Sequence, residues 1–150
     1  MARLEIRSFI RATPQRVWDV ISDLDTQERW MVDVRELRIL SEVRSGVGTV
    51  IDARTELFGL PLLHDVMEIT GWEPPRQLLV RHGGQFTGTG AFELEPAHDG
   101  TIFFWWEEFQ PPLGPLGELA FRLVVRPHML RVFARSMDNA RRLAESEPPA

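Results

Sequence analysis

The chain has 150 residues and a formal net charge of −5 at pH 7, which is the size of one domain and argues against a nucleic-acid partner or an anionic membrane surface. It contains no Cys and no Tyr, and all 17 of its basic residues are Arg, so disulfides, thiolate chemistry and Schiff-base enzymes are excluded. No apolar run approaches the ~20 residues that span a bilayer, and the N-terminus lacks a signal-peptide core. We therefore expect one globular domain over residues 1–150, located in the cytoplasm, with no insertion into a membrane.

The first part of the chain is expected to form a strand followed by two short helices. Residues 4–10 alternate between apolar and polar side chains, as a half-buried strand does. Thr13 and Pro14 are typical of a helix start, since Thr caps the first turn and Pro suits the first helical position. Asp25, followed by Glu28, indicates that a second short helix begins there.

Six further strands are expected between Arg35 and Phe109, because runs of β-forming residues are separated there by Gly, Pro and Asp turns. The expected strands span residues 37–43, 49–58, 62–72, 77–82, 85–95 and 101–109. Strands that follow two short helices and precede a long one predict an α+β protein.

A long helix is expected from Pro115 to about Ala144, because apolar residues recur there at helical spacing, and Pro127 should kink it. The stripe expected to face the sheet comprises Leu116, Leu119, Leu123, Leu130, Phe133, Met137 and Ala140. His128 lies opposite this stripe and is expected to face solvent. Four further apolar residues fall off the stripe and indicate either a second contact or a mobile lid over the pocket: Phe121, Val124, Val125 and Val132.

Short motifs along the chain resemble those of the SRPBCC superfamily, which includes START lipid-transfer domains and bacterial polyketide cyclase/dehydrase-like proteins. The motifs are Ala12-Thr-Pro14-x-x-Val17-Trp18, Gly46-Val-Gly48-Thr49, Trp72-Glu-Pro74-Pro75-Arg76 and Gly100-Thr101. Each is weak alone, but they occur in the superfamily's order over roughly the whole chain. The resemblance implies a helix-grip fold, in which a seven-stranded curved antiparallel sheet wraps around the long C-terminal helix, with two short helices after strand 1. It also implies a cavity for apolar small molecules between sheet and helix.

The last strand carries two candidate site residues, Trp105 and Glu107, which alternation places on one face. The resemblance favours this face as the cavity side, so Trp105 is either core or a flat wall for a ring-bearing ligand. A carboxylate on an apolar face is costly to bury charged. Three alternatives follow for Glu107: a structural ion pair with an Arg, a carboxyl group with a raised pKa, or a position in a solvated pocket where it acts as a catalytic acid.

The fifth expected strand carries the second catalytic candidate, His82, which shares its inward parity with Val80. His82 could orient a ligand hydroxyl, act as a base, or be a structural core or turn histidine whose ring nitrogens are hydrogen-bonded within the protein. Gly88 and Gly90 lack side chains on the expected cavity face and should leave room there. The full set of expected ligand-binding residues is Trp105, Phe103, Phe86, Gly88, Gly90, Phe92, Val80, Leu119 and Leu123.

Neither a metal nor another cofactor is expected. His64 and Glu68 lie on one strand face, but no third ligand is supplied nearby.

The preferred function is binding of an apolar or amphipathic small molecule in the cavity. Two alternatives stay open: a polyketide cyclase, aromatase or dehydratase that uses Glu107 or His82, and a protein-interaction module. The outer face of the last strand, with Ile102, Phe104 and Trp106, and the off-stripe helix residues would be exposed in a monomer. Because monomers seldom expose large apolar patches, a homodimer is expected.

Overall fold

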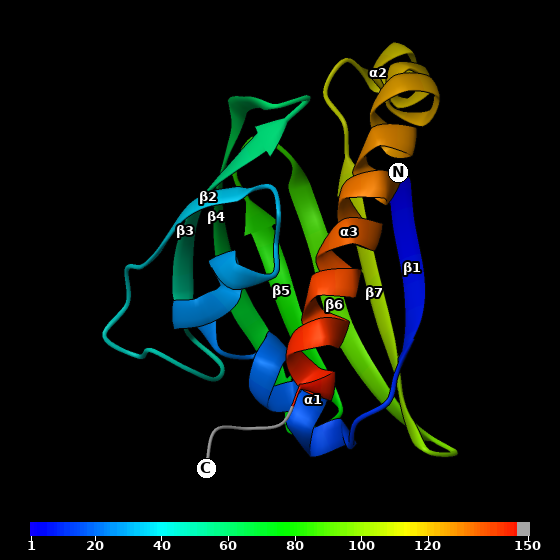
Figure 1. The fold of residues 1–150 in the computed structure, drawn as a ribbon. Helices are drawn as coiled ribbons and strands as arrows, with labels where there is room; N and C mark the ends of the chain where they lie inside the picture. Colours follow the sequence, from blue (N-terminus) through cyan, green and yellow to red (C-terminus); the bar gives the residue numbers. More distant parts are fainter. Residues whose placement is uncertain (147–150) are drawn as a thin grey trace.

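A seven-stranded antiparallel sheet curves around one long helical segment (Figure 1). The computed structural model describes residues 1–146, so the last four residues of the expected domain lie outside the described part. The strands are β1 (Ala2–Ile10), β2 (Val34–Ile39), β3 (Val50–Leu57), β4 (Leu60–Glu73), β5 (Gln77–Gly83), β6 (Thr87–Ala97) and β7 (Gly100–Gln110). Their order in the sheet is β1-β7-β6-β5-β4-β3-β2, so β1 and β2 form opposite edges.

Two short helices, α1 (Pro14–Ile21) and the 3₁₀ helix η1 (Leu24–Arg29), connect these two edges of the sheet. The Thr13 hydroxyl accepts a hydrogen bond from the backbone N–H of Arg16 at 3.2 Å and caps α1. The apolar side of α1 is buried, and its residues Val17, Trp18 and Ile21 join the core.

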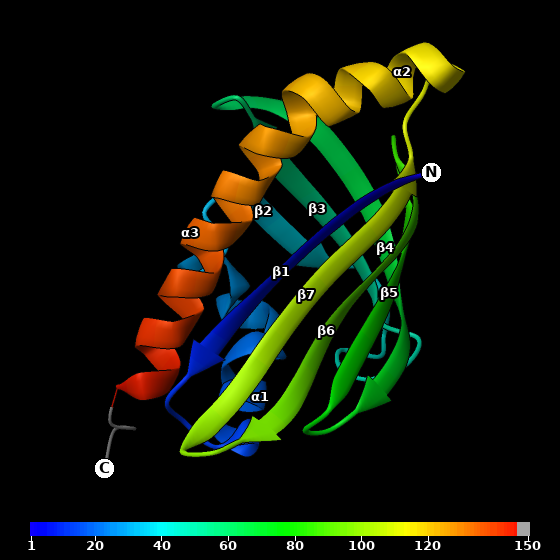
Figure 2. The same cartoon turned by 90° about the vertical axis from the view of Figure 1, so that its right-hand side faces the viewer.

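The sheet bends at three register shifts, one in each of the pairs β2–β3, β3–β4 and β4–β5. Such irregularities increase local twist and let a sheet curl around a helix. The curvature leaves β2 to β7 with a concave face that is turned toward the C-terminal segment (Figure 2).

The C-terminal segment consists of α2 (Gly114–Ala120), a π-helical turn η2 (Phe121–Val125) and α3 (Arg126–Glu145). Within η2 the N–H of Arg126 bonds to the carbonyl of Phe121, which is the i→i+5 pattern of a π turn. Pro127 follows directly and has no N–H to continue the ladder. Figure 2 shows the segment changing direction between α2 and α3.

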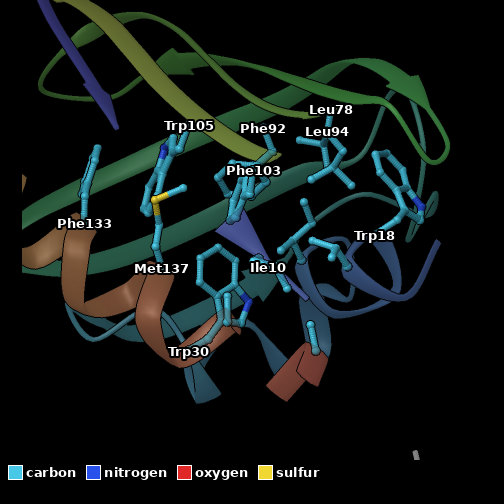
Figure 3. Packing of buried hydrophobic residues seen from close by; sticks show 14 of the residues in the cluster. Ile10, Trp18, Trp30, Leu78, Phe92, Leu94, Phe103, Trp105, Phe133 and Met137 are labelled. Atoms are coloured by element: carbon cyan, nitrogen blue, oxygen red, sulfur yellow. The ribbon is translucent and has the colours of Figure 1, made fainter. Parts of the chain in front are cut away.

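The core lies between α3, α1 and the β1–β7–β6 side of the sheet (Figure 3). Its largest fully buried side chains include Trp30, Trp105 and Phe103. Met137 of α3 is 2% exposed and belongs to the same cluster.

The helix-grip fold is confirmed, with local departures from the expected elements. Val43 lies in the loop 40–49 rather than in a strand, because the Ser41 hydroxyl bonds to the Val43 carbonyl and the Val50 N–H and holds the chain in a turn. His128 is half-buried rather than solvent-facing: its ring stacks on Phe58 of the β3–β4 turn at 4.3 Å between centroids.

The outer aromatics of β7 are partly covered by this chain's own arginines. The Arg3 guanidinium lies over the Trp106 ring at 4.9 Å, and Arg7 lies over Phe104 at 4.7 Å. Such contacts reduce the apolar area that this face offers to a partner. Within residues 1–146, no helix is long and apolar enough to cross a membrane.

Candidate functional site

The concave face of the sheet and the helical segment enclose a cavity of about 170 Å³. The lining comes from strands β2 to β7, from η1 and the segment that follows it, and from η2 and α3. Most of the lining is apolar. The acidic and imidazole exceptions are Asp33, His64, Asp65, His82 and Glu107.

An aromatic cluster belongs both to the core and to the lining of the cavity. The rings of Trp105 and Phe133 stack with 3.9 Å between their centroids and 9° between their planes. Figure 3 shows the two rings side by side. Phe92 packs edge-on against Trp105 at 5.3 Å. Since these three residues all line the cavity, they offer flat apolar surface to a bound molecule.

His82 lies between two carboxylates that come from different strands. Its Nδ1 bonds to Asp65 Oδ2, and its Nε2 lies 2.6 Å from Glu107 Oε2. The backbone N–H of Gly84 donates to Asp65 Oδ1 at 2.9 Å, and the Trp105 indole N–H donates to Glu107 Oε1 at 3.0 Å. The Asp65–His82–Glu107 cluster is therefore anchored at both ends, by the Gly84 N–H and by the Trp105 indole N–H.

The charges in this cluster favour a protonated His82. Burial lowers the pKa of the imidazole, but the charges of Glu107 and Asp65 and their hydrogen bonds outweigh burial and raise that pKa to about 10, from an ordinary value of 6.5. At neutral pH both ring nitrogens then carry a proton and both donate. The arrangement is an imidazolium held between two carboxylates, so His82 can give up a proton but has no free lone pair to accept one.

A third carboxylate, Asp33, lies in the segment between η1 and β2 and also lines the cavity. It is only 7% exposed, and its Oδ1 has no hydrogen-bond partner within residues 1–146. Burial is the main cause that raises the pKa of Asp33 to about 6; its own backbone N–H opposes the rise, and the charges of Glu107 and Glu56 add to it.

The sequence profile of one protein family, described as polyketide cyclase / dehydrase and lipid transport, matches residues 1–145. The chain belongs to this family. No curated protein sequence matches it.

Solved structures share the fold of this family member at low sequence identity. TTHA0849 from Thermus thermophilus superposes with a TM-score of 0.78 at 18% identity, covering 95% of this chain and 97% of that one. The di-domain ARO/CYC protein BexL from the BE-7585A biosynthetic pathway gives 0.76 at 14% identity, covering 98% of this chain and 51% of BexL. The Aha1 dimer from Colwellia psychrerythraea gives 0.64 at 16% identity, covering 97% of both chains.

The cavity of this polyketide cyclase/dehydrase family member brings together most of the residues predicted from strand parity. The predicted residues that line it are His82, Glu107, Trp105, Phe86, Phe92 and Val80. Phe103 does not line it, because it is fully buried in the core behind the aromatic cluster. Glu107 is ion-paired, but its partner is His82 rather than an arginine.

Gly88 and Gly90 do not line the cavity, contrary to the sequence prediction. A Cβ on Gly90 would lie 2.2 Å from Glu107 Oε2, its cross-strand neighbour. A Cβ on Gly88 would lie 1.9 Å from the Glu108 carbonyl oxygen. The space that these glycines leave is taken by the Glu107 carboxylate and by a close approach of β7, and not by a ligand.

Leu119 and Leu123 are also outside the cavity, with 44% and 64% of their surfaces exposed. The prediction assumed one continuous α-helix, whereas the π turn inserts an extra residue and rotates the preceding face. Phe121 and Val125 take the inward positions instead and line the cavity. Val132, expected off the inner stripe, is 8% exposed and belongs to the core.

Sequence reasoning missed two acidic residues of the site. Asp65 has the same strand parity as Leu63 and Met67, two apolar residues that also line the cavity, so alternation along β4 is the signal that could have found it. Asp33 lies outside any helix or strand, and no periodic pattern marks it.

His64 and Glu68 are held by other partners, Asp52 and Arg81 respectively. Among the described residues, no group of three or more acidic or histidine side chains is arranged to hold a metal ion.

Proposed function

We propose that this chain binds an apolar or amphipathic small molecule in the cavity between the sheet and α3. The observation that carries the proposal is a partly open, mostly apolar cavity of about 170 Å³ with a localised set of polar groups. Binding sites for small molecules combine these two properties, since apolar walls supply affinity and a few polar groups fix orientation. The stacked Trp105 and Phe133 rings suit a molecule that contains a flat ring.

Filling the cavity should abolish binding of a small aromatic probe while the protein stays folded. Ala53 lies on β3 and lines the cavity, so Ala53→Phe places a ring in the space that the probe would occupy. We expect the affinity for naphthylethanol, measured by titration calorimetry, to fall by more than about tenfold. The matched control is Ala134→Phe on the exposed side of α3, which should leave affinity unchanged.

Two outcomes would contradict ligand binding in this cavity. One is that the unmodified protein binds no small aromatic probe, whether neutral, cationic or anionic, at millimolar concentration. The other is equal binding by the Ala53→Phe variant while its circular dichroism and unfolding temperature match those of the control.

A second candidate function is acid–base chemistry on the bound molecule, as in a cyclase or dehydratase. The specific observation in its favour is the Asp65–His82–Glu107 cluster at the cavity wall, and BexL is described as an ARO/CYC protein. In a dehydration, a carboxylate such as Glu107 would take a proton from carbon while the His82 imidazolium gives one to the departing hydroxyl, which leaves as water. Mass spectrometry of a hydroxyketone incubated with the protein distinguishes the candidates, since pure binding returns the molecule unchanged.

We also propose that the chain forms a homodimer through the apolar side chains that η2 and α2 leave exposed. These are Leu116, Leu119, Leu123 and Val124, which range from 44% to 70% exposed. An Aha1 protein of the same fold is described as a dimer. Sedimentation equilibrium should show a dimer that Leu123→Arg dissociates and Ala134→Arg does not; a single species near 17.3 kDa would exclude it.

Three narrower expectations stay predictions: that residues 1–150 form one ligand-binding domain, that the protein is cytoplasmic, and that it has no nucleic-acid partner. The third alternative, a protein-interaction module on the outer face of β7, has less support because Arg3 and Arg7 cover the aromatics there.

A further inference from the structure

Asp33 is the one acidic side chain of the described cavity lining that has neither a cationic partner nor a side-chain donor. It is more than nine-tenths buried, being 7% exposed, and its Oδ1 is without a hydrogen bond. A buried carboxylate oxygen without a partner loses its hydration and gains nothing in return. Buried polar groups are satisfied in the great majority of cases, so an exception inside a cavity points to a group supplied by a ligand.

The charges that line the cavity are unbalanced toward the negative. Among the described lining residues there are three carboxylates, from Asp33, Asp65 and Glu107, and no arginine. The His82 imidazolium can neutralise only one of them. His64, the other imidazole, is paired with Asp52, a carboxylate outside the lining.

The helical wall does not offset this excess. The η2 and α3 side chains that line the cavity are all apolar: Phe121, Val125, Met129 and Phe133. Glu56 on β3 adds a further negative charge close enough to act on Asp33, and its own partner, Arg35, is 49% exposed. An anionic ligand would be repelled by this cavity, and a neutral one would leave the excess charge where it is.

We infer that the cavity takes an apolar molecule that carries a protonated amine, and that the Asp33 carboxylate holds the nitrogen. The inference rests on the proposed function, because it specifies which class of small molecule the cavity binds. The ammonium would donate to the Asp33 carboxylate, and the ring or chain attached to it would lie against Trp105 and Phe133. A charged pair out of water is among the stronger polar contacts in proteins, so the amine should be distinguished from an alcohol of the same shape.

Three probes with the same ring and different polar ends test this: naphthylethylamine, naphthylethanol and naphthylacetate. At about pH 7.5, where the amine is protonated, it should bind at least about tenfold more tightly than the alcohol, with the carboxylate weakest of the three. Asp33→Asn should remove most of the preference for the amine and leave the affinity for the alcohol within about twofold. Glu56→Gln is the control, because it removes a nearby charge that does not line the cavity, and the preference for the amine should persist.

The preference should also depend on pH. The other titratable groups that line the cavity are Glu107, His82, Asp65 and His64, and the charge of Glu56 also acts on Asp33. Since the pKa of Asp33 is raised to about 6, amine affinity should weaken as the pH falls through this value. Alcohol affinity should change much less, because it uses no charge on Asp33.

The results separate this inference from the proposed function. If naphthylethanol binds and naphthylethylamine binds no better, or if Asp33→Asn leaves the amine preference intact, the amine inference is wrong and the cavity still binds small molecules. If none of the three probes binds at millimolar concentration, both are wrong.

Discussion

His82→Leu should lower the free energy of unfolding at pH 7 by roughly 3 kcal/mol, because it removes the cation that lies between two carboxylates. The side chains of Glu107 and Asp65 are only 12% and 22% exposed, so water compensates them poorly once the imidazolium is gone. Urea unfolding followed by circular dichroism measures the loss. In the double variant that also carries Glu107→Gln, part of the loss should return, since one of the two uncompensated charges is removed.

The matched control is His64→Leu, on the neighbouring strand β4. His64 also pairs with an aspartate, but its side chain is 54% exposed, and ion pairs of that kind contribute about 0–1 kcal/mol. Equal effects of the two substitutions would show that the buried cluster does not carry the charge assigned to it.

The pH dependence of stability provides a second readout of the same cluster. The pKa of His82 is raised in the folded protein from 6.5 to about 10, so its stabilisation is fully present below the unfolded value. This stabilisation should be lost progressively as the pH rises from 6.5 toward about 10. The free energy of unfolding should fall by no more than about 1.4 kcal/mol per pH unit. His82→Leu should lack this decline, and a wild-type stability that is flat over the interval would contradict a protonated His82.

Asp33→Asn should have the opposite effect and stabilise the protein at neutral pH. The pKa of Asp33 is raised from 3.8 to about 6, so the ionised carboxylate is less favourable in the folded state than in the unfolded state. The stability of the unmodified protein should therefore fall as the pH rises from about 4 through about 6. The folded and unfolded pKa values of Asp33 differ by about two units. Above this pH interval the free energy of unfolding of the Asn variant should therefore exceed that of the unmodified protein by up to ~3 kcal/mol.

Measurements at two pH values test this assignment. The Asn variant should exceed the unmodified protein in urea unfolding near neutral pH, and the two should converge at about pH 4, where Asp33 is protonated in the fold. Asp138→Asn is the control, since Arg141 and Arg142 hold that exposed carboxylate and its loss should not stabilise. A destabilised Asp33→Asn variant near neutral pH would mean that the carboxylate has a partner.

Removing the His82 imidazolium should lower the free energy of unfolding and removing the Asp33 carboxylate should raise it, because the two groups have different surroundings. His82 is compensated on both sides, whereas Asp33 is buried without a partner. A residue that lowers stability where it stands is retained most readily when it binds something, and this is consistent with a role for Asp33 in ligand binding.

Alternation along the strands predicts which site residues share a face of the sheet. Side-chain direction alternates along a strand for reasons local to its backbone, so parity put Trp105 and Glu107 on one face and His82 on the face of Val80. The family resemblance then favoured the Trp105 face as the cavity side. The ordered motifs from Ala12 to Thr101 indicated the helix-grip fold, and the Thr13–Pro14 helix start is present as expected.

Which of these residues contact one another depends on how the strands and helices pack. The partners of His82 come from β4 and β7, and their contact depends on register across several strands, which no single segment specifies. Gly90 makes room for the Glu107 carboxylate because the two residues are paired across β6 and β7. The π turn beside Pro127 decides which face of the C-terminal segment points inward. The burial of Asp33 depends on how the η1–β2 connection packs, because a residue outside regular structure has no periodicity that tells in advance which way its side chain will face.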